Sequence, residues 1–215
     1  MERIVYTKAG GLDSIAIEEF EETILGTGEV RVRVSRAGIN FADLMMRQGL
    51  YGSAPDFPFT PGYEASGVIS AIGEGVEGLE VGQRVLAMTG FGGYSQSVQI
   101  SADRAIPIPN EMSHDAAASL GVTYGTAYHM LVHLGNLRAG DSVLIHHAAG
   151  GVGTAAAQIC HAYGATNLIG TASAAKKEFV EAQGMRFVDR DSEDFVEVCK
   201  SLTNGKGVNQ AIDPV

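Results

Sequence analysis

The stretch HHAAGGVGTAAAQ, residues 146–158, follows the apolar run 142–145 and leads into a series of alanines. An apolar run, a glycine-rich turn and an alanine-rich segment in this order predict a strand that turns directly into a helix. The usual glycine pattern of such a turn, G-x-G-x-x-G, matches at Gly150 and Gly153, whereas Ala148 stands at its first position. The stretch therefore raises the question of what this turn holds.

The composition limits the classes of protein to which the chain can belong. Its 215 residues are enough for one large or two modest domains with a sizeable core. With 25 acidic and 15 basic residues the net charge is −10, and no basic patch stands out, so we expect no nucleic-acid partner. No secretory signal precedes the first strand pattern, and no run approaches the roughly 18 apolar residues of a membrane span. Cys160 and Cys199 fit core positions rather than a disulfide framework or a redox pair, so we expect a cytoplasmic protein without an integral membrane segment.

The pattern of strand-like and helix-like segments changes near residue 125. Before it, short alternating segments such as 30–34 and 94–98 are typical of half-exposed strands. Five glycines between residues 67 and 82 predict tight turns with positive φ and hence a small, strongly bent sheet; they are Gly67, Gly73, Gly75, Gly78 and Gly82. The segment 116–137 is predicted to be a helical bridge between the two halves of the chain.

After residue 140, strand-like and helix-like segments alternate. This alternation predicts a parallel sheet with crossover helices, and Gly164 and Gly184 stand where left-handed helix C-caps are expected. The first strand-to-helix turn of such a sheet directs backbone N–H groups and a helix N-terminus at one point, which attracts a pyrophosphate. The leading hypothesis for the opening stretch is therefore a dinucleotide site.

The end of the second strand distinguishes between NADH and NADPH. NAD sites carry an acid there, about 20 residues after the glycine turn, to bind the adenosine ribose. The sequence IGTASAAKKEF, residues 169–179, has no acid at 170–173 and instead offers hydroxyls followed by Lys176 and Lys177, while Arg190 follows the third strand. Hydroxyls and cations suit a 2′-phosphate, so we predict NADPH as the cofactor. The alternative is that the two lysines only form a solvated helix face.

Four ordered motifs carry a resemblance to a known family. They are AGINFADLMMRQGLY (37–51), FTPGYEASGVI (59–69), GEGVEGLEVGQRV (73–85) and HHAAGGVGTAAAQ (146–158). Together they resemble the medium-chain dehydrogenase/reductase superfamily, and within it the zinc-free quinone oxidoreductase branch and the vesicle amine transport protein group. The resemblance implies a GroES-like β domain over residues 1–124, which would bind the substrate. It also implies an interdomain helix and the first half of a Rossmann NADP-binding domain over 125–215, with the active site in the cleft between the domains.

The sequence differs from the zinc-dependent members of this superfamily at positions that would bind zinc. Zinc alcohol dehydrogenases place a cysteine where Asn40 stands and a histidine where Tyr63 precedes Glu64, so two ligands of a catalytic zinc are replaced. His129 and His133 have helical spacing but no adjacent acid in the same motif, and we interpret them as ordinary helix residues. We therefore predict no metal site.

Without a metal, hydrogen bonds or a conjugated substrate must assist hydride transfer, so a quinone or an enone is the expected substrate. The resemblance implies that Asn40 and Tyr51 line the substrate cleft and that Thr126 contacts the nicotinamide carboxamide. Tyr51 is either a proton donor or a packing residue, and Met45 stands where some quinone reductases have a second tyrosine. The predicted cofactor residues are Thr126, Ala149, Gly150, Gly151, Val152, Gly153, Thr171, Ser173, Lys177 and Arg190.

Three functions remain open at this point. The first is an NADPH-dependent, zinc-independent quinone or enone reductase, which the resemblance implies to be a homodimer at full length. The second is a non-catalytic NADPH-binding protein of the same fold. The third is an enoyl reductase module of a larger synthase, against which we count the initiating Met1 just before the first strand pattern.

The final residues, VNQAIDPV, resemble the fourth Rossmann strand and its following loop. The resemblance implies that family members continue with further strands, so we expect a sheet in the order 3-2-1-4, truncated after about its fourth strand. Both a natural truncation and a fragment of a longer protein would explain this. We expect such a chain to retain weak binding of the adenosine phosphate but little reductase activity, because hydride geometry would be loose.

Overall fold

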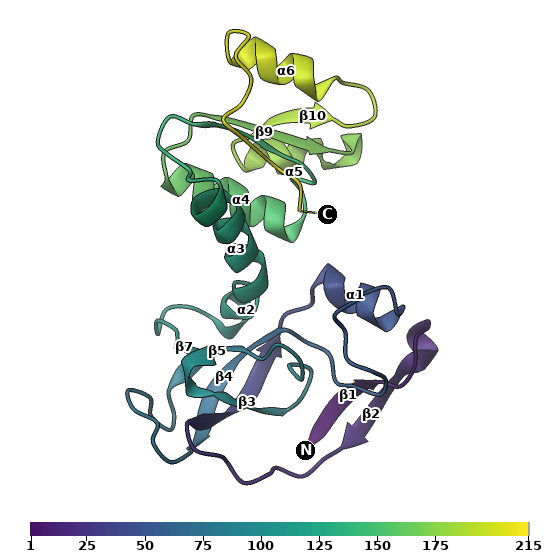
Figure 1. The fold of residues 1–215 in the computed structure, drawn as a ribbon, viewed down its shortest axis with the longest axis vertical. Coiled ribbons are helices and arrows are strands. Elements are labelled where there is room, and N and C mark those ends of the chain that lie inside the picture. Colours follow the sequence, from purple (N-terminus) through teal and green to yellow (C-terminus); the bar gives the residue numbers. More distant parts are fainter. Residues whose placement is uncertain (215) are drawn as a thin grey trace. The chain divides into compact units, whose positions relative to one another are not determined.

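The chain forms two units, each built on sheets of its own (Figure 1). The computed structural model describes residues 1–214. The first unit comprises Met1–Val122 and the second begins at Thr123. The helices and strands of the first unit are β1 (Glu2–Tyr6), β2 (Ile15–Glu19), β3 (Glu29–Ala37), α1 (Phe41–Arg47), β4 (Glu64–Ile72), β5 (Arg84–Met88), β6 (Ser97–Ser101), β7 (Ala105–Pro107) and α2 (His114–Ala117), with 3-10 turns at Leu12–Ser14 and Ala102–Arg104.

The first unit is mostly antiparallel β structure. Strands β1 and β2 form a two-stranded ribbon, and the larger sheet has the order β6-β3-β4-β5-β7. Two register shifts interrupt the pairing of β3 with β4, which fits a strongly curled sheet. Its core is a cluster of buried aliphatic side chains, namely Val30, Val32, Ile69, Val85, Ala87, Val98, Ile100 and Ala105.

Two details of the first unit differ from expectation. The strand expected from residue 94 begins only at Ser97, because the preceding residues pair with β1 instead: Ile4 N donates to Tyr94 O at 2.8 Å, and Arg3 bridges Ser95. Of the five turn glycines, Gly67 and Gly73 do not have positive φ. They are required for space, since a Cβ on Gly67 would lie 2.0 Å from Arg33 O.

The second unit is a parallel α/β sheet in the order β10-β9-β8-β11. Its elements are α3 (Gly121–Tyr128), which begins in the first unit, a π-helix at His129–Leu134, β8 (Ser142–Ile145), α4 (Gly151–Ala162), β9 (Asn167–Ala172), a 3-10 turn at Ala174–Lys176, α5 (Lys177–Ala182), β10 (Arg186–Asp189), α6 (Phe195–Leu202) and β11 (Gln210–Ile212). Gly164 and Gly184 have φ of 76° just past α4 and α5, as predicted.

Both faces of the parallel sheet are buried. Alternate residues of β8 point to opposite faces: Val143 and Ile145 pack with α4 and α5, whereas Leu144 packs with Cys199 of α6. Figure 1 shows α6 on the opposite side of the sheet from α4. The predicted fold class, a strongly bent β domain followed by a doubly wound parallel sheet, is confirmed.

Candidate functional site

The turn between β8 and α4 exposes the backbone N–H groups at the start of α4. Gly150 is the N-cap residue of α4, with extended backbone and no side chain to cap the first turn. The 12-residue helix therefore begins with N–H groups that no side chain of its N-cap satisfies, which is the usual setting for a phosphate. Gly153 is required for space, because a Cβ there would lie 2.6 Å from His147 O and 2.7 Å from Ala148 Cα.

The geometry explains the alanine at the first position of the glycine pattern. Ala148 is fully buried, and the positive φ of this turn, 50°, falls on His147 instead. The methyl group of Ala148 faces Gly170 of the neighbouring strand β9, where a Cβ would lie 2.7 Å from Ala148 Cβ. The glycine that is missing from the turn is thus matched by a glycine across the sheet.

The predicted residues around this turn are brought together in part. Gly151 packs on α3, because a Cβ there would meet Thr123 Cγ2 at 2.9 Å, and the exposed Thr126 lies on the same helix. Thr171 is 4% exposed, and its Oγ1 lies 2.9 Å from His146 Nδ1, so the hydroxyl is engaged by a histidine. The remaining predicted residues of the turn, Ala149 and Val152, are half-buried.

The groups predicted to bind a 2′-phosphate lie at the carboxyl ends of β9 and β10. Arg190 N donates to Ala172 O at 3.0 Å, which brings Arg190 beside Ser173. Lys177 begins α5 after the 3-10 turn, and its exposed Nζ lies 4.0 Å from Glu181 Oε1. Exposed ion pairs of this kind are weak, so the cation remains available to an anion.

In the first unit, Asn40 directly precedes α1 and forms a capping box with Asp43. Asp43 is 1% exposed, and its Oδ2 accepts hydrogen bonds from Asn40 N at 2.8 Å and from the Tyr94 hydroxyl at 2.9 Å. Burial raises the pKa of the Asp43 carboxyl, and these hydrogen bonds oppose the rise. Burial raises the pKa of the Tyr94 hydroxyl, and the neighbouring Asp43 carboxyl raises it further.

Glu64, at the start of β4, is a second buried acid. It is 1% exposed; its Oε1 accepts from Asn40 Nδ2 at 3.0 Å, and its Oε2 accepts from Val122 N at 2.9 Å. The sequence analysis did not name either acid as a candidate site residue. The available signal was that Asp43 and Glu64 interrupt otherwise apolar or small-residue motifs next to Asn40 and Tyr63.

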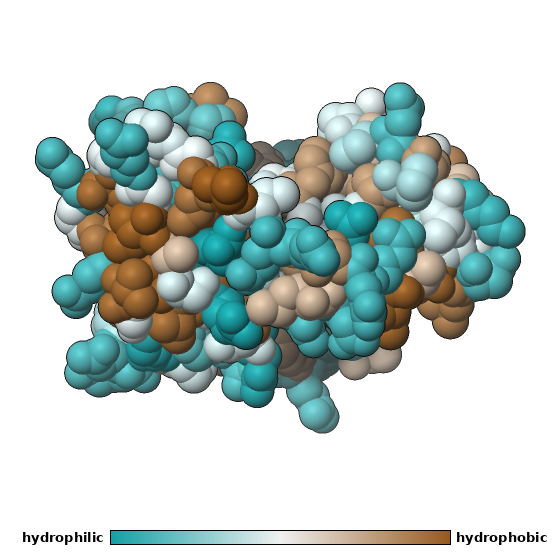
Figure 2. All heavy atoms as spheres, turned by 90° about the horizontal axis from the view of Figure 1, so that it is seen from below, coloured by the Kyte–Doolittle hydropathy of each residue, from teal (hydrophilic) through white to brown (hydrophobic). Residues whose placement is uncertain are grey.

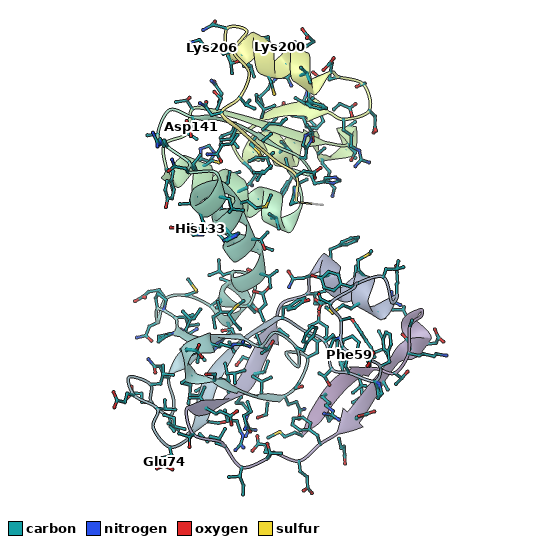
Figure 3. All side chains as sticks on the ribbon, viewed as in Figure 1. Phe59, Glu74, His133, Asp141, Lys200 and Lys206 are labelled. Atoms are coloured by element: carbon teal, nitrogen blue, oxygen red, sulfur yellow. The ribbon has the colours of Figure 1, made fainter. Side chains whose placement is uncertain are left out.

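Aromatic rings flank this polar cluster. Tyr51 and Tyr63 meet edge to face with centroids 6.5 Å apart, and Phe91 lies 5.3 Å from Tyr63. Burial, followed by the hydrogen bond to Tyr51, raises the pKa of Tyr63 to about 12. The rings belong to a larger aromatic cluster that includes Phe59, labelled in Figure 3.

Three further features of the described residues bear on the site. No three His, Cys, Asp or Glu side chains within residues 1–214 are grouped to hold a metal ion, and the rings of His129 and His133 stack on each other at 4.9 Å. None of the helices in that range is both long and apolar enough to span a bilayer. A groove of about 400 Å³ runs between β1, β3 and the segment 93–96, with Ile17 and Ile39 on its wall. Figure 2 shows hydrophobic residues, in brown, gathered among hydrophilic ones on the face that it draws.

Comparisons with known proteins agree with this architecture. Residues 26–110 match the alcohol dehydrogenase GroES-like domain, and residues 151–215 match the zinc-binding dehydrogenase family. The synaptic vesicle membrane protein VAT-1 homolog of Danio rerio is 42% identical over 214 residues, which are 99% of this chain and 44% of the relative. A phthiocerol polyketide synthase subunit of Mycobacterium tuberculosis is 38% identical over 216 residues, covering 98% of this chain and 10% of the subunit.

Solved structures are similar over nearly the whole chain. The human VAT-1 homolog-like protein has a TM-score of 0.92 at 36% identity, covering 99% of this chain and 68% of that one. The Escherichia coli quinone oxidoreductase complexed with NADPH has a TM-score of 0.88 at 35% identity, covering 97% and 64%. CurK enoyl reductase has a TM-score of 0.91 at 32% identity, covering 100% and 67%. The chain spans about half the length of the VAT-1 relatives that it matches.

Proposed function

Because the chain belongs to the medium-chain dehydrogenase/reductase superfamily and, within it, to the group of VAT-1 homologues, we propose that it reduces quinones or α,β-unsaturated carbonyl compounds with NADPH. The observation that carries this proposal is the uncapped β8–α4 turn, in which Gly153 must lack a side chain. An E. coli quinone oxidoreductase of the same fold forms a complex with NADPH.

The residues of the second unit fit this cofactor. The first turn of α4 would bind the pyrophosphate through the N–H groups of Gly151, Val152 and Gly153. Ser173, Lys177 and Arg190 would bind the 2′-phosphate, since two cations and a hydroxyl stabilise a dianion. Thr126 would contact the carboxamide, and Thr171 would act through its contact with His146 rather than directly. When bound, NADPH supplies the hydride.

Residues of the first unit would bind the substrate. Asn40 offers a carboxamide donor for the carbonyl oxygen, and Tyr51 either donates a proton or orients the carbonyl. Zinc has no part in this proposal, because Asn40 and Tyr63 are poor replacements for the cysteine and histidine ligands of zinc dehydrogenases. The substrate is therefore a compound whose conjugation already favours hydride addition.

A second function is supported by two of the similar proteins. CurK is an enoyl reductase, and the mycobacterial relative is a polyketide synthase subunit of which this chain matches 10%. Reduction of enoyl thioesters, but not of quinones, would favour this alternative. Tight NADPH binding without turnover of any substrate would favour a non-catalytic NADPH-binding protein.

Lys177 provides the direct test of the cofactor. Fluorescence titration should show that NADPH binds at least about tenfold more tightly than NADH, and Lys177→Ala should weaken NADPH alone. Lys200→Ala is the matched control, because this lysine lies on α6 (Figure 3) and should leave both affinities unchanged. Equal affinities for the two nucleotides in the wild type would contradict the proposal. A panel of quinones, enones and simple aldehydes then tests the substrate class.

The same proposal includes organisation and location. We assign the substrate domain to residues 1–124 and the cofactor domain to 125–215, with a homodimer at full length and no nucleic-acid partner. We place the protein in the cytoplasm. Since the similar VAT-1 proteins are named as vesicle membrane proteins, cell fractionation is the appropriate test of this location.

A further inference from the structure

Glu64 carries a carboxylate that is fully enclosed by the first unit. No ion pair of Glu64 is found among residues 1–214, and its two oxygens accept from neutral donors, the Asn40 amide and the Val122 backbone N–H. A buried acid that is held only by neutral hydrogen bonds is unfavourable for stability unless every bond is made. Such a group points to a role beyond packing.

Both hydrogen bonds at Glu64 are donated to its carboxylate. Val122 N–H donates to one carboxylate oxygen, and Asn40 Nδ2 donates to the other. At its other end, the Asn40 side chain accepts from the backbone N–H of Asp43 in the capping box. Since both oxygens of Glu64 accept, the atom of Asn40 that faces Glu64 is the nitrogen, and the Asn40 side-chain oxygen faces α1.

The backbone leaves Glu64 no room to move. A Cβ on Gly38 would lie 2.6 Å from Glu64 Oε1, and a Cβ on Gly121 would lie 2.8 Å from Oε2 and 2.3 Å from Met88 Sδ. Two glycines therefore let the chain close directly on the two oxygens. The carboxylate is fixed in place, and so is the amide that donates to it.

We propose that Glu64 is a positioning residue whose carboxylate fixes the orientation of the Asn40 carboxamide, so that the second N–H of this group donates to the carbonyl oxygen of the substrate. This inference rests on the proposed function. A carbonyl oxygen gains negative charge as hydride adds to its conjugated carbon, and it keeps that charge until it is protonated. A donor already fixed in position stabilises this charge without reorganisation.

The substitution Glu64→Gln tests the direction of the hydrogen bonds. The new side chain must offer its oxygen to Val122 N–H, which turns its NH2 group toward that of Asn40 and forces the Asn40 amide to rotate. We expect kcat for quinone or enone reduction to fall about 10- to 100-fold, with the KM for NADPH unchanged. Glu74→Gln, at an exposed glutamate labelled in Figure 3, is the matched control and should leave kcat and Tm unchanged.

A double variant separates positioning from folding. Adding Asn40→Asp to Glu64→Gln restores a complete set of hydrogen bonds, because the new carboxylate accepts both from the amide at position 64 and from Asp43 N–H. We expect Tm to recover toward the wild-type value while kcat remains low, since no N–H is left to face the substrate. Recovery of kcat together with Tm, or an unchanged kcat in Glu64→Gln alone, would overturn the proposal.

Nuclear magnetic resonance gives a readout without turnover. In the wild type, the Asn40 Nδ2 resonance should shift on addition of 2-cyclohexen-1-one, and in Glu64→Gln it should not. Absence of a shift in the wild type overturns the role of Glu64 even if reduction is observed. Conversely, a wild type that shifts but reduces neither quinones nor enones rejects the proposed function and retains the assignment of Glu64.

Discussion

The candidate binding regions of the two units, each taken by itself, are built in opposite ways. In the second unit, the β8–α4 turn offers backbone N–H groups at the start of α4, and Gly153 and Gly170 lack side chains where a Cβ would clash. In the first unit, buried acidic side chains, Asp43 and Glu64, organise Asn40 through hydrogen bonds. The difference teaches that the proposed phosphate site depends on the path of the backbone, whereas the proposed carbonyl donor, Asn40, depends on other side chains that hold it in position.

The largest expected effect tests the match between Ala148 and Gly170. In Gly170→Ala the new methyl group would lie 2.7 Å from Ala148 Cβ and 2.9 Å from Val180 Cγ1. We expect a loss of about 3 kcal/mol in the free energy of unfolding, as in other overpacked cores. Adding Ala148→Gly should recover part of the loss, because it removes the shortest contact. Urea denaturation measures both, and a double variant no more stable than Gly170→Ala would show that the two positions are not matched.

Gly153→Ala tests the turn itself. The added Cβ would lie 2.6 Å from His147 O, so we expect a loss of about 2 kcal/mol and of NADPH binding. Gly125→Ala is the matched control, since it lies in helix α3 with open space at its Cβ and should stabilise by up to about 1 kcal/mol. Calorimetry and nucleotide titration give the two readouts. Unchanged stability of Gly153→Ala would contradict the close approach.

Tyr94→Phe tests the hydrogen bonds of the buried acids in the first unit. It removes the hydroxyl that donates to Asp43 Oδ2 and leaves a buried acid with one donor fewer on that oxygen. We expect a loss of about 1–2 kcal/mol, while NADPH affinity is unchanged. Chemical denaturation and fluorescence titration would show this separation. A variant as stable as the wild type would mean that water replaces the hydroxyl and that the cluster is less enclosed than the structure shows.

The smallest effect concerns His114. Ser66 Oγ donates to Val85 O, so the His114 Nδ1 that lies 2.8 Å from it is the donor of that contact, and Arg84 faces the other ring nitrogen. Burial, then Arg84 and Arg36, lowers the pKa of His114 from its ordinary value of 6.5, against the opposing charge of Asp115.

The lowered pKa makes stability depend on pH. Unfolding returns the His114 pKa to its ordinary value, so the unfolded chain binds the extra proton first, and acid favours unfolding. Stability from this contact should be complete above about pH 6.5 and should decline as the pH falls below it. Tm measured between pH 8 and pH 5, in steps of about half a unit, should fall less in His114→Asn than in the wild type. Parallel curves for the two proteins would exclude His114 as the source.

Sequence reasoning succeeded where local rules decide. The glycine turn and the helix C-caps at Gly164 and Gly184 follow from periodicity and backbone constraints along a short stretch. The strand order of the parallel sheet is expected from the family resemblance instead. Sequence reasoning could not find contacts between distant residues. Asn40 and Glu64 are 24 positions apart, and the match of Ala148 with Gly170 depends on how two strands pair.

The position of β8 in the centre of its sheet has a consequence for the order of folding. Its neighbour β9 is close in sequence, because the hydrogen bond between His146 and Thr171 joins residues 25 positions apart. Its other neighbour, β11, is more distant, because the bond between Ser142 and Asn209 joins residues 67 positions apart. Closing the longer loop loses more chain entropy, so we expect β8 to pair with β9 first and with β11 last. Pulse-labelled hydrogen exchange would show late protection of His146 N, which donates to Ile212 O. During synthesis, the β8–α4 turn would therefore form while one edge of β8 is still unpaired.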